Sequence, residues 1–159
     1  MGKNYEPASD FLKDIIAEEI PLSETGFGAI NLQRLIAFTQ DENATNRDWA
    51  TLLLAQTALD TPDVRTALLR AFDDEDIYVS AEALLGVAER DRHLALPLAR
   101  QALQRDFAPM AVFEAVTIIA DASLTDLMRP WVEPSGQDWL DDCAQTALNA
   151  CIGKGDIVN

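Results

Sequence analysis

Apolar residues recur at helical spacing along most of the chain. Near the start, Phe11, Leu12, Ile15 and Ile16 fall on one side of a helix, with charged residues between them. Alternation of apolar and polar residues, the mark of a strand, is nearly absent. The pattern predicts an all-α protein. Its amino-terminal elements are expected to be a helix at 8–20, a loop at 21–28 and a second helix at 29–39.

From there on the chain repeats itself with a period of 32 or 33 residues. Four alanines hold equivalent places in successive blocks, namely Ala50, Ala83, Ala115 and Ala147. Acidic residues precede each block, and a second helical segment separates one block from the next. Self-similarity at this period indicates stacked pairs of helices, which is an α-solenoid.

Each repeat is expected to contain a first (A) helix and a second (B) helix. The A helices are expected at 46–59, 77–90, 109–121 and 137–152, and the B helices at 62–72, 93–105 and 124–132. Thr61 and Pro62 mark one B-helix start, as an N-cap followed by proline at the first helical position. About four repeats result, and the helix at 8–20 would cap the apolar end of the stack. The chain then divides into a capping helix and loop at 1–28, a repeat array at 29–152 and a tail at 153–159.

One repeat carries a family resemblance. In DEDIYVSAEALLGVAER (residues 74–90), acidic residues and a Val precede an Ala-rich helix that ends in Leu-Gly. This stretch resembles the short HEAT-like repeats of bacterial HEAT-repeat proteins related to the phycobilin-lyase type. Ser80 stands where that repeat usually has Arg, whereas the block around Arg47 keeps the Arg but lacks the Val. The resemblance covers about residues 30–152 and implies a binding scaffold of short HEAT-like antiparallel helix pairs.

Charge and composition restrict the partners. Asp and Glu number 27 against 12 Lys and Arg, giving a formal charge of −15 in 159 residues. Such a protein repels polyphosphate, so no nucleic-acid partner is expected. The chain has no apolar run near the ~20 residues of a membrane span, and its start lacks a signal-peptide pattern. We therefore expect a cytoplasmic protein with no membrane partner.

Few residues suggest chemistry. Cys143 and Cys151 lie about 12 Å apart along one predicted helix, too far for a disulfide, and are expected to be buried. His93, the single histidine, is expected in solvent, and the acidic run at 73–76 is expected to stabilise the start of the next helix. The equivalent residues Glu82 and Glu114 are expected on the surface or in ion pairs. We therefore expect no enzyme, no cofactor and no bound metal. Three tryptophans are expected in the packing between repeats: Trp49, Trp131 and Trp139.

Arginines recur at matched positions of the B helices. Alignment of these helices pairs Arg65 with Arg100, and Arg70 with Arg105 and Arg129. In HEAT-like arrays the B helices usually line the concave face, so the arginines are candidate binding residues. A cation in the last turn of a helix also satisfies terminal carbonyls, which explains the second row equally well. Arg65 and Arg100 are expected at mid-helix, where that explanation fails. Two interpretations of the arginines are therefore kept: they border a binding groove, or they form structural contacts that join neighbouring repeats.

The function expected from these features is a non-enzymatic scaffold that docks a protein or peptide on the concave B-helix face. An acidic peptide would meet one arginine per repeat. The acidic charge also allows an inhibitor or immunity-type protein that blocks a basic enzyme. A non-catalytic accessory subunit of an enzyme is the remaining alternative.

Overall fold

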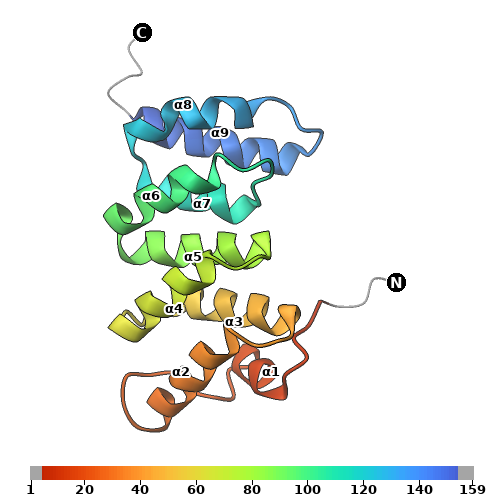
Figure 1. The fold of residues 1–159 in the computed structure, drawn as a ribbon, viewed down its shortest axis with the longest axis vertical. Helices are drawn as coiled ribbons and strands as arrows, with labels where there is room; N and C mark the ends of the chain where they lie inside the picture. The colour runs from red at the N-terminus through yellow and green to blue at the C-terminus, as the bar shows by residue number, and fades with distance from the viewer. Residues whose placement is uncertain (1–4, 154–159) are drawn as a thin grey trace. The chain divides into compact units, whose positions relative to one another are not determined.

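The computed structural model describes residues 5–153, and within them it contains nine α-helices, two short 3-10 helices and no strand (Figure 1). The elements in chain order are α1 Asp10–Ile16, α2 Gly26–Phe38, α3 Ala44–Gln56, α4 Pro62–Phe72, α5 Ile77–Arg90, α6 Arg92–Ala102, α7 Met110–Ile119, η1 Ala122–Leu124, α8 Thr125–Met128, η2 Arg129–Val132 and α9 Asp138–Ile152. Of the predicted tail at 153–159, all but Gly153 lies outside the described residues.

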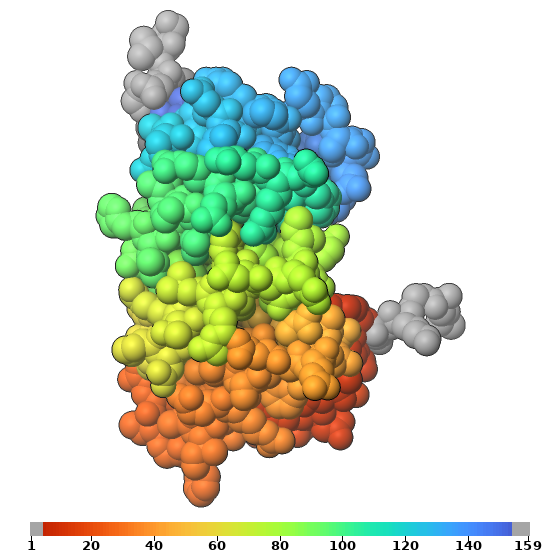
Figure 2. Space-filling view, viewed as in Figure 1, coloured from red at the N-terminus to blue at the C-terminus, as the bar shows by residue number. Residues whose placement is uncertain are grey.

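The helices form two compact units that divide within α5, after Ala83. In the first unit α3 packs against α1, α2 and α4. In the second unit α7 packs against α6 and α9, and α9 also contacts η1, α8 and η2. In the space-filling view of Figure 2, side chains cover the gaps that the ribbons of Figure 1 leave between neighbouring helices of each unit. Each unit is thus a stack of helices joined by short turns.

The repeat alanines lie at the centre of this packing. Ala50, Ala83, Ala115 and Ala147 are each fully buried, with no exposed surface. Each belongs to an A helix, namely α3, α5, α7 and α9. A small side chain lets neighbouring helices approach closely, which explains why the same residue type returns once in every repeat.

Two predicted helices, at 62–72 and 77–90, match α4 and α5 to the residue. Thr61 Oγ1 accepts the N–H of Val64 at 3.2 Å, and Pro62 opens α4, as the N-cap pattern predicts. Ahead of α5, the Asp76 carboxylate accepts the N–H of Tyr78 at 2.9 Å. The acidic run at 73–76 therefore stabilises a helix start, as expected.

The first helix is shorter than predicted. Ser9 is its N-cap, and α1 ends at Ile16, ahead of Glu18, which adopts a left-handed φ of 59°. Phe11 and Leu12 are buried as expected, but Ile16 is 42% exposed. The expectation that Ile16 packs on the array is wrong, because this residue points about 140° around the helix from Phe11, beyond the arc that faces α3.

The last B helix differs most from its prediction. The segment expected as one helix at 124–132 consists of η1, α8 and η2. Pro130 has no N–H, so it cannot donate to the Asp126 carbonyl and the α-helix cannot continue through it. The preceding B helix, α6, ends at Ala102 and not at residue 105. There, the carbonyl of Leu103 accepts the indole N–H of Trp131 at 3.1 Å.

Candidate binding site

Two of the five candidate arginines, Arg65 and Arg70, belong to the first unit and have different surroundings. Arg65 donates from Nε and Nη2 to the carboxylate of Asp60, at 2.7 and 2.9 Å. Asp60 lies just before Thr61, the N-cap of α4, so Arg65 has a local partner that the sequence pattern did not suggest. Arg70 lies in the last turn of α4 and is exposed.

The other three candidate arginines belong to the second unit. Because α6 ends at Ala102, Arg100 lies in its last turn, and the expected mid-helix position is wrong. Its Nη2 donates to Ser123 Oγ at 3.0 Å. Arg105 was expected in the last turn of its helix, but it follows the end of α6. Arg129 opens η2 and forms a solvent-exposed ion pair with Asp126 at 3.5 Å.

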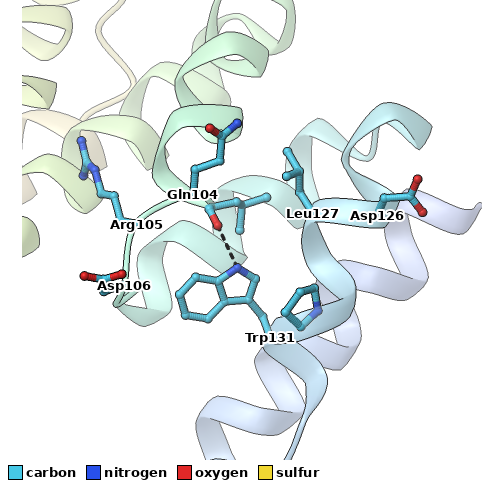
Figure 3. Close-up of a pocket in the computed structure, with 8 residues that line it drawn as sticks. Gln104, Arg105, Asp106, Asp126, Leu127 and Trp131 are labelled. Carbon is cyan, nitrogen blue, oxygen red and sulfur yellow. Dashed lines mark hydrogen bonds between the residues drawn. The ribbon is translucent and has the colours of Figure 1, made fainter.

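One of these arginines lines a hollow between B-helix elements (Figure 3). The hollow has a volume of about 460 Å³. We call it the Trp131 hollow, and its lining residues are Leu103, Gln104, Arg105, Asp106, Asp126, Leu127, Pro130 and Trp131. They come from the end of α6 and the connection after it, and from α8 and η2. The Trp131 hollow therefore lies on the B-helix elements, where a partner is expected.

The indole ring of Trp131 is fixed from two sides. Its Nε1 donates to the Leu103 carbonyl at 3.1 Å, and its ring meets the Phe113 ring edge-on with centroids 5.8 Å apart. Trp131 also lines a second hollow of about 230 Å³, together with Phe107 and Leu140. A ring held in this way forms a rigid apolar wall between two hollows. The expectation that Trp131 packs between repeats is confirmed.

The Trp131 hollow combines apolar walls with charged edges. Leu103, Leu127 and Pro130 accompany the indole ring. In Figure 3 the guanidinium of Arg105 extends away from this ring. Asp126 brings a carboxylate whose side chain is 98% exposed. Such a site can accept an apolar side chain against the indole while both signs of charge are available to the residues beside it.

The remaining tryptophans differ from Trp131. Trp49 stacks on Tyr5 with ring centroids 5.8 Å apart, and its buried Nε1 has no hydrogen-bond partner among residues 5–153. Trp139, in the first turn of α9, is 59% exposed. The expected packing of Trp139 between repeats is therefore wrong, since its position at the helix start directs it to solvent.

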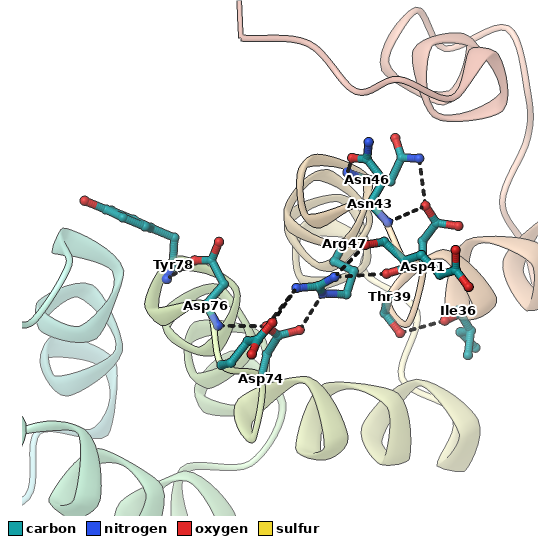
Figure 4. A network of polar contacts seen from close by, with 11 residues as sticks. Ile36, Thr39, Asp41, Asn43, Asn46, Arg47, Asp74, Asp76 and Tyr78 are labelled. Carbon is teal, nitrogen blue, oxygen red and sulfur yellow. Dashed lines mark hydrogen bonds and ion pairs between the residues drawn. The ribbon is translucent and has the colours of Figure 1, made fainter.

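A polar network centred on Arg47 occupies the first unit (Figure 4). Arg47 Nε lies 2.9 Å from Asp74 Oδ2, and the two side chains are only 14% and 10% exposed. Arg47 also donates to the carbonyls of Asp41 and Glu42, at 3.1 and 3.3 Å. The hydrogen bond to Asp74 raises the pKa of the Arg47 guanidinium above its ordinary value. The acidic run thus joins one repeat to the next, a role that sequence reasoning missed although an Arg in one repeat and an Asp before the next were its visible signals.

The single histidine lies at the surface, and the two cysteines lie on one helix. His93 is exposed in the first turn of α6. Cys143 and Cys151 are both free thiols on α9, and burial raises the pKa of Cys151 to about 11. Cys143 is only partly buried, contrary to expectation.

Among residues 5–153, no three His, Cys, Asp or Glu side chains are grouped so that they could hold a metal ion. No helix in that range has both the length and the apolar character needed to cross a membrane.

Among known proteins, no family model and no curated protein matches the chain. The fold resembles the X-ray structure of YibA from Escherichia coli, with a TM-score of 0.58 and 17% sequence identity. The match covers 87% of this chain and 54% of YibA, so the chain spans about half the length of that protein. At this identity the likeness shows the fold alone. With the helix stacks above, it confirms the predicted class, an all-α solenoid of short antiparallel helix pairs.

Proposed function

We propose that this protein is a non-enzymatic binding scaffold that docks a protein or peptide segment on its B-helix elements. The observation that carries the proposal is the Trp131 hollow, in which a fixed indole ring, two leucines and a proline form an apolar floor. Aromatic side chains in pockets with polar rims are the usual anchors of protein interfaces.

The arginines add a preference in charge. Arg105 lies at the edge of the Trp131 hollow, and we propose that it pairs with a carboxylate of the bound segment. Arg65, Arg70, Arg100 and Arg129 stay proposed as weaker contacts, because none of them lines the Trp131 hollow. An acidic segment with one apolar anchor fits this arrangement.

The setting of this function follows from the composition. We propose a cytoplasmic protein without a cofactor. We also propose that it has no nucleic-acid or membrane partner, since a charge of −15 repels phosphate-rich surfaces. We further propose membership of the HEAT-repeat proteins. The support is the motif at residues 74–90 together with the burial of one equivalent alanine in each repeat.

The test is affinity capture from the source lysate with the purified chain as bait. A double variant, Arg105→Ala with Leu127→Ala, removes the charged edge and part of the apolar wall. It should lose at least about tenfold of a captured partner, because a charged contact and a buried leucine together exceed 1.4 kcal/mol. Arg92→Ala, at an exposed arginine in the first turn of α6, is the matched control and should capture as the parent does.

Washing at low and high salt distinguishes the kind of contact. A partner anchored on the indole ring should persist at high salt, whereas one held only by charge is released. If the double variant remains folded by circular dichroism and captures the partner as well as the parent does, the Trp131 hollow is not the site.

A further inference from the structure

The A helices of the second unit carry a separate hollow, which none of the residues of the Trp131 hollow lines. Its volume is about 370 Å³. We call it the A-helix hollow, and it is lined by Leu85, Glu89, Glu114, Thr117, Ile118, Cys143 and Thr146. These residues come from the second-unit part of α5 and from α7 and α9. Its floor is apolar, through Leu85 and Ile118, and two glutamates stand beside it.

Exposed apolar side chains continue this surface towards the starts of α7 and α9. Trp139 is 59% exposed and Met110 is 41% exposed. Trp139, Cys143 and Thr146 follow one another at i, i+4 and i+7, so they lie on one face of α9. Cys143 Sγ lies 4.0 Å from the Met110 carbonyl, which places the first turn of α7 beside this face. An exposed tryptophan and methionine next to a hollow are typical of a surface that a partner covers.

The charge of this surface has one sign. The two helices α7 and α9 carry Glu114, Asp138, Asp141 and Asp142, and neither helix contains Lys, Arg or His. Within the part of the chain that the structure describes, Glu89 and Glu114 form no ion pair. The nearest cation along the chain, Arg90, donates to the Gly86 carbonyl of its own helix. Burial and the charge of Glu114 together raise the pKa of Cys143, as expected for a thiol in a negative hollow.

We infer that the A-helix face of the second unit, from Trp139 to Glu89, docks a basic amphipathic segment of a partner protein. Apolar side chains of that segment cover Met110 and Trp139 and enter the A-helix hollow, and its lysines or arginines meet Glu89 and Glu114. The combination of apolar anchors at helical spacing with flanking charge is the usual form of helix-in-groove recognition.

Charge selects this occupant over the alternatives. A second copy of the chain carries the same charge of −15 and the same acidic helices, so the two copies repel each other. Nucleic acid and anionic lipid are repelled for the same reason. A basic segment alone gains from both the apolar and the acidic parts of the face.

The test uses two synthetic 14-residue amphipathic peptides, one built from leucine and lysine and the other from leucine and glutamate. The leucine-lysine peptide should bind the full chain, and it should slow alkylation of Cys143 by iodoacetamide, mapped by mass spectrometry. Cys151, which is 2% exposed, serves as the internal reference for an unreactive thiol. The leucine-glutamate peptide should do neither.

Three variants locate the contact. Glu89→Gln with Glu114→Gln should weaken binding by about tenfold, from two partly exposed ion pairs of about threefold each. Trp139→Ala should weaken it by a similar factor, and folding should be unaffected because the side chain is exposed. The control, Glu24→Gln with Glu133→Gln, makes the same change in net charge at exposed residues outside both the A-helix hollow and the Trp131 hollow, and should alter binding by less than about twofold.

Three results would overturn the inference. Equal losses in the control and in the glutamate variant would mean that net charge alone attracts the peptide. Binding that leaves Cys143 fully reactive would place the peptide elsewhere. A dimer in sedimentation that protects Cys143 without any peptide would make a second copy the occupant. None of these results bears on the Trp131 hollow, so the proposed function is tested separately.

Discussion

Arg47 and Asp74 illustrate how a single residue can join two repeats of the first unit. Arg47 lies in the first turns of α3, and Asp74 lies in the turn before α5, 27 residues later. Their guanidinium and carboxylate are mostly shielded from water, so each charge depends on the other for its solvation. The carbonyls of residues 41 and 42 both accept from Nη1 of Arg47, so the turn at residues 41–42 is tied into the same network.

Removal of Arg47 should therefore be costly. We expect Arg47→Ala to lower the free energy of unfolding by about 3 kcal/mol, because it leaves the Asp74 carboxylate shielded and unpaired. Arg129→Ala is the control, since its pair with Asp126 is exposed and should change stability by less than about 1 kcal/mol. Urea titration of both variants measures the difference, and equal effects would show that Arg47 contributes no more than a surface ion pair.

Asp48 gives the first unit a dependence on pH. Burial raises the pKa of this carboxyl group, and the negative charges of Asp76 and Asp74 raise it further, against the hydrogen bond donated by Tyr5. An aspartate whose pKa is higher in the folded state binds its proton more tightly there. Stability is then lost as the pH rises through the folded pKa, above the ordinary value of about 3.9.

Asp48→Asn should remove this loss. We expect the variant to have a higher melting temperature than the parent at pH 7, and the difference should disappear at about pH 3, where the parent carboxyl group is protonated in both states. Thermal unfolding at several pH values measures it. A variant that is less stable than the parent at pH 7 would mean that the hydrogen bond from Tyr5 outweighs the cost of the buried charge.

Among the elements, α1 packs a narrow face against the repeats. Phe11 stacks on Phe38 with centroids 5.6 Å apart, and Asn46 of α3 accepts the backbone N–H groups of Ala8 and Ser9, at 2.8 and 3.0 Å. Leu12 is fully buried, whereas Ile16, one turn later, is 42% exposed. A helix of seven residues can thus be fastened at one side and at its start without burying every apolar residue.

Leu12 and Ile16 form a matched pair for testing this attachment. Leu12→Ala should lower the free energy of unfolding by about 3 kcal/mol, since it leaves a cavity in a fully buried site. Ile16→Ala deletes a side chain of the same composition from an exposed site and should cost less than about 1 kcal/mol. Urea unfolding compares the two, and similar losses would mean that α1 buries both faces in solution.

The same scale shows what the sequence could and could not predict. The helices α4 and α5 were predictable to the residue because their limits are local, set by Thr61 with Pro62 and by the acidic turn. The end of α6 was not, since the carbonyl of Leu103, the residue just past the helix, accepts the indole N–H of Trp131, 28 residues further on. The Trp131 hollow arises from that same long-range contact, so the sequence could indicate Arg105 as a binding candidate and Trp131 as a packing residue but could not bring them together.

At the scale of the whole molecule, net charge is the dominant electrostatic feature. With 27 acidic and 12 basic side chains, the folded chain concentrates a formal charge of −15 in a smaller volume than the unfolded chain does. Self-repulsion of this kind destabilises the compact state. The ion pairs of Arg47 and Arg65 oppose it locally, and salt weakens both effects, most strongly between exposed charges.

We therefore expect added salt to stabilise the protein. Between about 10 and 300 mM NaCl the Debye length falls from about 30 Å to below 8 Å, so repulsion between distant carboxylates is screened while the shielded Arg47–Asp74 pair, at 2.9 Å, is little affected. The melting temperature should rise by several degrees over this range, because 1 kcal/mol corresponds to about 2–4 °C in a chain of this size. Most of the rise should come below about 150 mM, which separates screening from the general effect of salt on apolar surface, since the latter continues to grow at higher concentrations. Scanning calorimetry over a series of NaCl concentrations measures this curve. A melting temperature that falls with salt would instead mean that the few ion pairs, and not the excess of acidic residues, govern the electrostatic stability of the fold.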